Sequence, residues 1–129
     1  MSAVESLASP GASSEDARPL SYRGPYGLTE DQELFQRTVR EFAEREIVPT
    51  VHEYDESERF PRENVARMAE LGLLGLLVPE QYGGAGVSTL EYVLAMEEIS
   101  WACASHSVIM SVNNSLVCDP ILRFAQALG

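Results

Sequence analysis

Apolar residues recur every three to five positions along the chain from residue 28 onward, with polar residues between them. This spacing is typical of amphipathic helices that bury one face in a core. The alternation of apolar and polar residues that marks strands is absent, so the pattern predicts an all-α bundle of about five or six helices. The clearest stripes are Leu34, Phe35, Val39, Phe42, Ala43 and Ile47; Leu90, Val93, Leu94, Met96, Ile99 and Trp101; and Val108, Ile109, Val112 and Leu116.

Two helix starts are marked by capping-box spacing. Thr29 is followed three positions later by Gln32, and Ser88 by Glu91. In a capping box the hydroxyl accepts from the third backbone N–H, and the longer side chain accepts from the N–H of the capping residue. The first helix should break or turn at Pro49, because proline lacks an N–H and clashes with the preceding turn.

The middle and the end of the chain carry further boundary signals. Phe60-Pro61 fits a helix with proline at its first position, and Gly72 fits a C-terminal cap. The apolar run from Leu71 to Val78 predicts a compact connector that a small bundle leaves underused. Small residues around Ser105 predict a break and restart, and Asp119-Pro120 predicts a separate last helix over 121–128.

The first 27 residues differ in composition from the rest. They are rich in Ser, Ala, Gly and Pro, and such a segment buries too little apolar surface to offset the entropy of ordering it. Residues 1–27 are therefore predicted to form a flexible tail, and residues 28–129 a helical domain. A length of 129 residues has room for one domain.

The charge excludes two classes of partner. The chain has 20 acidic and 9 basic residues, a formal net charge of −11 and no Lys. Binding to nucleic acid or to an anionic membrane surface requires clustered Lys and Arg, so neither partner is expected. The longest apolar run has 8 residues, Leu71 to Val78, too short to cross a bilayer. The start of the chain resembles neither a signal nor a transit peptide, which favours a cytoplasmic protein.

Residue chemistry alone reveals no active site. His106 lies between two serines, but neighbours on a helix point in different directions and no acid is placed to orient the ring. A histidine at a helix start or core edge explains it better than a catalytic base. His52 stands in an acidic, solvated stretch without metal-ligand spacing. No catalytic residue and no metal ligand are therefore assigned in this chain.

Other reactive or flexible residues also favour ordinary structural roles. Glu97 and Glu98 are interpreted as paired charges on a helix surface, although one of them could be partly buried. Cys103 and Cys118 are 15 positions apart, which predicts two small core residues rather than a disulfide or a zinc site. The glycines at 83, 84 and 86 follow no strand and lack the spacing of a phosphate-binding loop.

A series of short motifs resembles a known family over about 100 residues, in order and with family-like spacing. These motifs are Leu28-Thr29-Glu30-Asp31-Gln32, Phe42-Ala43-Glu44-Arg45-Glu46-Ile47-Val48-Pro49, Phe60-Pro61, Glu70-Leu71-Gly72-Leu73-Leu74-Gly75, Pro79-Glu80-Gln81-Tyr82-Gly83-Gly84 and Asn114-Ser115-Leu116. From Leu28 to Gly129 the chain resembles the N-terminal α-helical domain of the acyl-CoA dehydrogenases, especially the short-chain, butyryl-CoA type. The resemblance implies a fragment of the full enzyme.

The resemblance implies an FAD-dependent oxidoreductase of fatty acid β-oxidation. In that family a glutamate removes the α-proton of an acyl-CoA thioester, a hydride passes from the β-carbon to FAD, and an electron-transfer flavoprotein takes the electrons. The glutamate lies in a C-terminal helical domain, and FAD is held by that domain and a middle β domain. Neither domain is present here, so no FAD-binding residue is assigned. Family members are usually homotetramers.

One contribution to the substrate site is carried over from the resemblance. The helix with Val108, Ile109, Val112 and Leu116 resembles the family helix that lines the acyl-chain cavity. Positions 108, 112 and 116 share one helix face, as a wall against a hydrocarbon chain requires. Packing inside the chain's own bundle explains the same spacing, so both interpretations stay open. Val112, at a position where medium-chain relatives carry a longer polar residue, favours a short or branched acyl group.

A different class of function also fits the sequence. The fold could form a standalone, non-catalytic helical interaction module or a decayed remnant of the enzyme. A domain shaped to dock on others should expose an apolar patch, whereas an adapted module should carry polar residues there.

Overall fold

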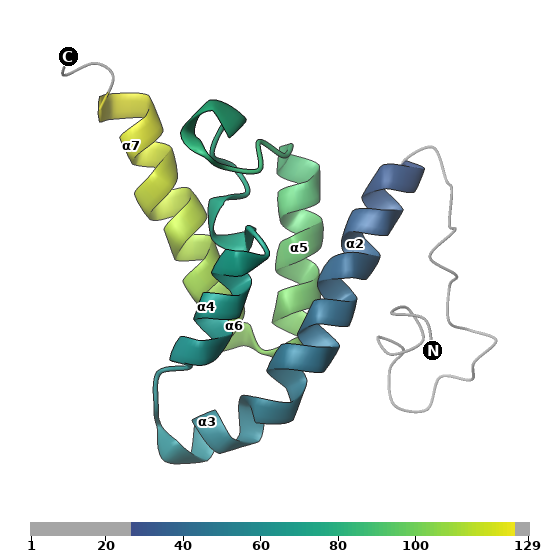
Figure 1. Cartoon of the computed structure of the whole chain (residues 1–129), viewed down its shortest axis with the longest axis vertical. Helices are drawn as coiled ribbons and strands as arrows, with labels where there is room; N and C mark the ends of the chain where they lie inside the picture. Colours follow the sequence, from purple (N-terminus) through teal and green to yellow (C-terminus); the bar gives the residue numbers. More distant parts are fainter. Residues whose placement is uncertain (1–26, 126–129) are drawn as a thin grey trace.

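The computed structural model describes residues 27–125, which form six α-helices linked by short π and 3₁₀ segments and contain no strand (Figure 1). The tail predicted over residues 1–27 lies, apart from Gly27, outside this range. No helix in the described range is long and apolar enough to cross a membrane. The α-helices are α2 (Glu30–Phe42), α3 (Val51–Ser57), α4 (Arg62–Glu70), α5 (Thr89–Ala102), α6 (Ala104–Ser111) and α7 (Asp119–Phe124).

The predicted all-α class is confirmed, but the helices join into fewer pieces than expected. Within the described part of the chain, they form 4 continuous helical segments instead of five or six. A π segment, η1 (Ala43–Ile47), and a 3₁₀ turn, η2 (Val48–Thr50), join α2 to α3. A second π segment, η5 (Val112–Cys118), joins α6 to α7. Each junction leads into a proline, and both prolines were predicted to interrupt or begin a helix.

A local change of helix type accommodates each proline. In an α-helix, proline removes one N–H and its ring clashes with the carbonyl four residues back. A π or 3₁₀ turn shifts the hydrogen-bond spacing to the carbonyl five or three residues back, so the helix can bend at this point and continue. At Pro49 the chain turns from α2 into α3 (Figure 1). At Pro120 the helix runs on, which corrects the prediction of a separate last helix.

The break predicted around Ala102 to Ser105 is confirmed. Cys103 is extended, with φ −164° and ψ 117°, so α5 ends at Ala102 and α6 restarts at Ala104 in a new direction. Neither Cys103 nor Cys118 is fully buried; both are half-buried and free. The break makes α5 and α6 antiparallel neighbours (Figure 1).

The core lies where α2, α4, α5 and α6 meet. Its fully buried apolar side chains come from each of these helices and from the connector after α4. Leu73 and Leu76 of that connector are only 1% and 2% exposed, so the apolar run is part of the core, not an underused segment. The core consists of Val39, Phe42, Ala43, Ile47, Met68, Leu73, Leu76, Ala95, Ile99 and Met110.

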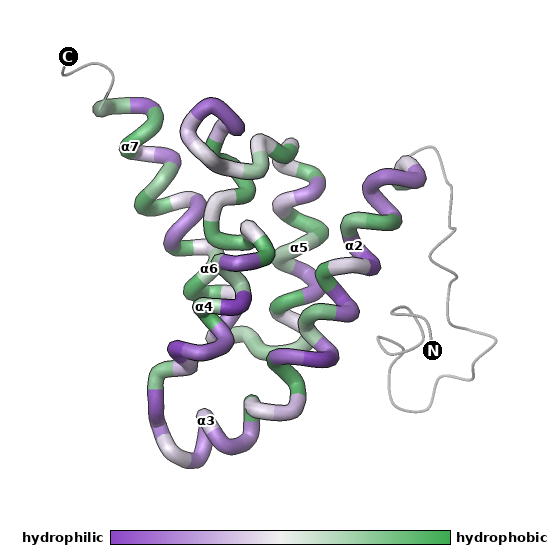
Figure 2. Tube along the Cα trace, viewed as in Figure 1, coloured by the Kyte–Doolittle hydropathy of each residue, from purple (hydrophilic) through white to green (hydrophobic). Residues whose placement is uncertain are grey.

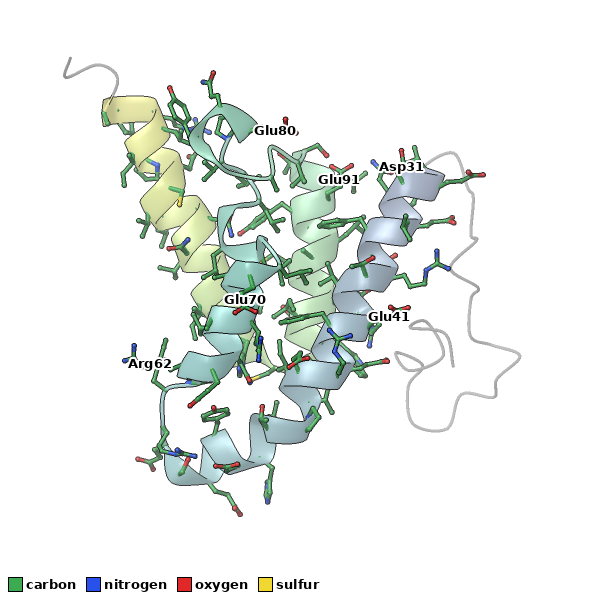
Figure 3. The ribbon with its side chains drawn as sticks, viewed as in Figure 1. Asp31, Glu41, Arg62, Glu70, Glu80 and Glu91 are labelled. Atoms are coloured by element: carbon green, nitrogen blue, oxygen red, sulfur yellow. The ribbon has the colours of Figure 1, made fainter. Side chains whose placement is uncertain are left out.

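Both predicted capping boxes are present, at the same end of the bundle. Thr29 and Gln32 close one, and Ser88 and Glu91 close the other. Because α2 and α5 run side by side in the same direction, their N-termini lie close together, as the labelled Asp31 and Glu91 show (Figure 3). Gln32 Nε2 donates to Glu91 Oε1 at 3.2 Å and so connects the two caps.

Candidate functional site

An exposed apolar row runs along the outer edge of the bundle, on the helical segment formed by α6, η5 and α7. The side chains of Val108, Val112 and Leu116 are 60%, 40% and 69% exposed, and Ile109 is half-buried. Hydrophobic turns recur along this segment (Figure 2). Packing inside the bundle, the alternative explanation of their spacing, therefore does not account for the three exposed residues. We call Val108, Val112 and Leu116 the exposed row.

The opposite side of the same helical segment is fixed to the bundle. Met110 is fully buried in the core, and Asn114 is fully buried against the connector that follows α4. Asn113 Nδ2 also donates to the Leu74 carbonyl at 2.6 Å. One face is therefore rigidly packed while the other presents apolar side chains outward, the arrangement of a wall that another layer must cover.

An apolar groove lies beside this helical segment. It has a volume of about 450 Å³ and separates α7 from the turn η4 (Glu80–Tyr82). The side chains around it are almost entirely apolar, which is typical of a surface that receives another apolar group. The groove is lined by Val78, Tyr82, Cys118, Ile121, Leu122 and Ala125.

His106 is a buried structural residue. Its ring is 2% exposed, and its Nε2 accepts from Asn64 Nδ2 at 3.0 Å. Burial lowers the pKa of His106, which favours the neutral ring that this hydrogen bond requires. The neighbouring Ser107 hydroxyl bonds to Ser100 at 2.6 Å instead of to the imidazole. No pairing of nucleophile and base is formed here.

Glu98 corrects the interpretation of the 97–98 pair as surface charges. It is fully buried, accepts from Gln36 Nε2 at 2.7 Å and pairs with the Nε of Arg40. The Arg40 guanidinium lies 3.7 Å from the centre of the Trp101 ring, a cation–π contact. Burial raises the pKa of Glu98, and Arg40 opposes this shift. The cluster joins α2 to α5 inside the bundle, which is a structural role.

The glycine-rich loop after Val78 does not fit a phosphate group. Gly84 N–H donates to Pro79 O at 3.2 Å, and Gly86 N–H donates to Val78 O at 2.9 Å. These amides are therefore occupied by the loop's own carbonyls and cannot receive an anion. A Cβ on Gly84 would lie 2.0 Å from the Val78 carbonyl oxygen, so close backbone packing explains the glycine. The described residues contain no group of three potential metal ligands.

Comparison with known proteins decides the family. The sequence profile of the acyl-CoA dehydrogenase N-terminal domain matches residues 29–127, most of the chain. This chain belongs to the acyl-CoA dehydrogenases. The described helices of this acyl-CoA dehydrogenase domain are also similar to the butyryl-CoA dehydrogenase structure from Megasphaera elsdenii, with a TM-score of 0.69 and 32% identity over 77% of this chain and 27% of the other.

Among the relatives of the acyl-CoA dehydrogenase domain are enzymes named as short-chain specific. The mitochondrial short-chain specific enzyme of Mus musculus is 51% identical over 100 residues, which is 78% of this chain and 24% of the relative. The short-chain specific enzyme of Clostridium acetobutylicum is 47% identical over 96 residues, 74% of this chain and 25% of the relative. A structure described as the electron transferring flavoprotein of Acidaminococcus fermentans matches with a TM-score of 0.73 and 39% identity, over 77% and 26% of the two chains. The domain thus spans about a quarter of its curated relatives' length.

Sequence reasoning missed two features of the acyl-CoA dehydrogenase domain. The groove beside α7 joins segments about 40 positions apart, and no local pattern signals it. The burial of Glu98 depends on Arg40 and Gln36, on another helix. The apolar residues around Glu98 were its one local signal, since an ionised group in such a stretch needs a partner.

Proposed function

We propose that this domain forms part of an FAD-dependent acyl-CoA dehydrogenase that introduces a double bond between the α- and β-carbons of a short or branched acyl-CoA thioester. Its contribution is a wall of the acyl-chain pocket, built by the exposed row and the half-buried Ile109. The proposal rests chiefly on the exposed row. The short-chain specificity named for the relatives supports the substrate class.

The chemistry of the row suits an acyl chain. Val108, Val112 and Leu116 are branched aliphatic side chains with no polar group to satisfy, so contact with a hydrocarbon removes apolar surface from water on both sides. Their exposure in this domain leaves them available to a chain bound between this layer and the rest of the enzyme. Short or bulky acyl groups fit a wall of such residues because the side chains limit the depth of the pocket.

The remaining parts of the reaction belong to other parts of the enzyme. FAD is proposed to be held by the middle and C-terminal domains of the complete enzyme; the glycine-rich loop of this domain uses its Gly84 and Gly86 amides internally. An electron-transfer flavoprotein is the proposed electron acceptor, and the likeness to a structure described with that protein supports it. A homotetramer and a cytoplasmic location stay predictions.

A domain exchange tests the proposal. Residues 27–125 replace the matching segment of the mouse short-chain enzyme, and the flavin-loaded chimera is assayed with acyl-CoA thioesters of increasing chain length. We expect activity that is greatest with short chains. Val112→Ala should widen the pocket and raise kcat/KM for longer chains relative to short ones by about ten-fold, the effect of removing one or two carbons from an apolar pocket wall.

A matched control separates the row from the rest of the surface. Val117 is 44% exposed and lies on the same π segment, next to the row but outside it. Val117→Ala should leave the chain-length profile unchanged. A folded, flavin-loaded chimera without dehydrogenase activity would contradict the proposed function and favour the interaction module, and an unchanged profile in Val112→Ala would contradict the wall.

A further inference from the structure

Two consecutive asparagines attach the π segment η5 to the connector after α4. The fully buried Asn114 donates from Nδ2 to the Leu73 carbonyl at 2.8 Å, and its Oδ1 accepts from the Leu77 N–H at 3.4 Å. Asn113 Nδ2 donates to the Leu74 carbonyl at 2.6 Å. We call Asn113 and Asn114 the asparagine clamp. The clamp bonds to three backbone groups of this connector, the carbonyls of Leu73 and Leu74 and the N–H of Leu77.

The clamp also accounts for the π spacing of η5. Asn114 Nδ2 donates a second bond, 3.0 Å long, to the Met110 carbonyl four residues back. Side chains that bond to the carbonyl at i−4 compete with the α-helical ladder and distort it. Beyond the clamp, Pro120 has no N–H to continue that ladder. Before the proline, the Asp119 N–H donates to Asn114 O five residues back, which is π spacing.

This spacing straightens the exposed row. In an α-helix, four residues advance about 400°, so Val112 is rotated about 40° from Val108. A π turn advances about 80° per residue, so the four residues from Val112 to Leu116 turn about 40° short of a full circle. The two deviations nearly cancel. Leu116 therefore points in almost the same direction as Val108, whereas an uninterrupted α-helix would carry it about 80° away.

We propose that the asparagine clamp positions the exposed row and thereby sets which acyl-chain lengths the enzyme accepts. Asn113 and Asn114 face the connector, on the side of the helical segment away from the row, so they act through Val112 and Leu116 and touch no substrate. This inference rests on the proposed function, because the row must line the acyl pocket for its alignment to matter. The clamp residues are positioning residues.

The chimera provides the test in the assembled enzyme. Asn114→Ala and the milder Asn113→Ala should each change the ratio of kcat/KM between short and long acyl chains by about ten-fold, because a displaced branched side chain alters the pocket by one or two carbons. Asn64→Ala is the matched control. Asn64 is 5% exposed and bonds to Thr50 and to His106 on α6, not to the connector that the clamp holds. It should lower stability while leaving the ratio unchanged, since simple destabilisation affects all substrates alike.

Hydrogen exchange of the 129-residue chain supplies a readout that does not depend on activity. Loss of the clamp should speed hydrogen exchange of two amides. In Asn114→Ala, the Leu77 N–H loses its acceptor, Asn114 Oδ1, and the Asp119 N–H loses the π geometry of its bond to the Asn114 carbonyl. Asn64→Ala should leave both amides protected. Unchanged exchange in both clamp variants overturns the clamp as the cause of the π turn. Faster exchange with an unchanged chain-length ratio in an active chimera overturns the positioning role. An inactive parent chimera contradicts the proposed function instead.

Discussion

Replacing Arg40 with methionine should expose how strongly the interior of the bundle depends on one ion pair. Arg40 is 2% exposed, and its partner Glu98 is fully buried. Methionine has a similar length and no charge, so Arg40→Met leaves the Glu98 carboxylate with only Gln36 as a side-chain donor. Breaking a buried pair in this way costs about 3–5 kcal/mol, a large part of the roughly 5–15 kcal/mol that holds a domain together.

The cost should depend on pH, in a direction that the structure determines. Burial raises the pKa of Glu98 above its ordinary value of 4.5, and Arg40 opposes that rise. Without Arg40 the pKa rises further, so folding takes up a proton over a wider pH range above 4.5. A raised carboxyl pKa means that stability is lost as pH increases through that range. The deficit of Arg40→Met should therefore be largest near pH 7.5 and smaller near pH 5.

Urea unfolding followed by tryptophan fluorescence measures this directly. Trp101 is the only tryptophan in the chain and lies over the Arg40 guanidinium, so it reports on the perturbed site, and circular dichroism reports on the helices. With a typical urea dependence of about 2 kcal/mol/M, the midpoint should fall by about 2 M. Arg67→Met, which removes an exposed pair with Glu70, should leave the midpoint nearly unchanged.

The double variant Arg40→Met/Glu98→Met completes a cycle. Apolar residues of similar size can replace a buried pair at little net cost, so the double variant should be much more stable than Arg40→Met alone. Equal losses at pH 7.5 and pH 5, or a double variant whose loss equals the sum of the single losses, would refute the reasoning.

Two further predictions concern His106 and the glycine-rich loop. Burial lowers the pKa of His106, so the stability that the neutral ring contributes is present above the ordinary pKa of 6.5 and is lost as the pH falls below that value. The difference in urea midpoint between the wild type and His106→Gln should therefore shrink from pH 7.5 to pH 5. A constant difference would contradict this prediction. Gly84→Ala should lower the melting temperature more than Gly83→Ala. The first substitution places a Cβ against the Val78 carbonyl, whereas the second costs only the strain of φ +84°, about 1 kcal/mol. The reverse order of melting temperatures would contradict the packing argument.

The features predicted from the sequence are those with local causes. The capping boxes at Thr29 and Ser88 need only residues three positions apart, and both are present. The helical stripes follow from a periodicity of 3.6, which is why the all-α class was predictable. The prolines gave the right places for a change of direction or helix type. They gave the wrong number of separate helices, because π and 3₁₀ turns carry the chain past both of them.

The features that escaped prediction depend on residues far apart in sequence. Glu98 is buried because Arg40, 58 positions earlier, compensates its charge. The spacing of Val108, Val112 and Leu116 predicted a shared face from α-helical geometry alone. The π turn that straightens this row depends on bonds from Asn114 to a connector about 40 positions away. A single sequence contains these residues but not their proximity.

Because Gln32 donates to Glu91, the N-termini of α2 and α5 both depend on the Glu91 carboxylate. Glu91 accepts from its own cap at Ser88 and from Gln32, and both bonds hold its pKa below the ordinary value. Acidification that protonates this one carboxyl group weakens the first turns of two helices that start 59 positions apart. Fraying at this end of the molecule should thus begin in both helices at once, as a single cooperative event.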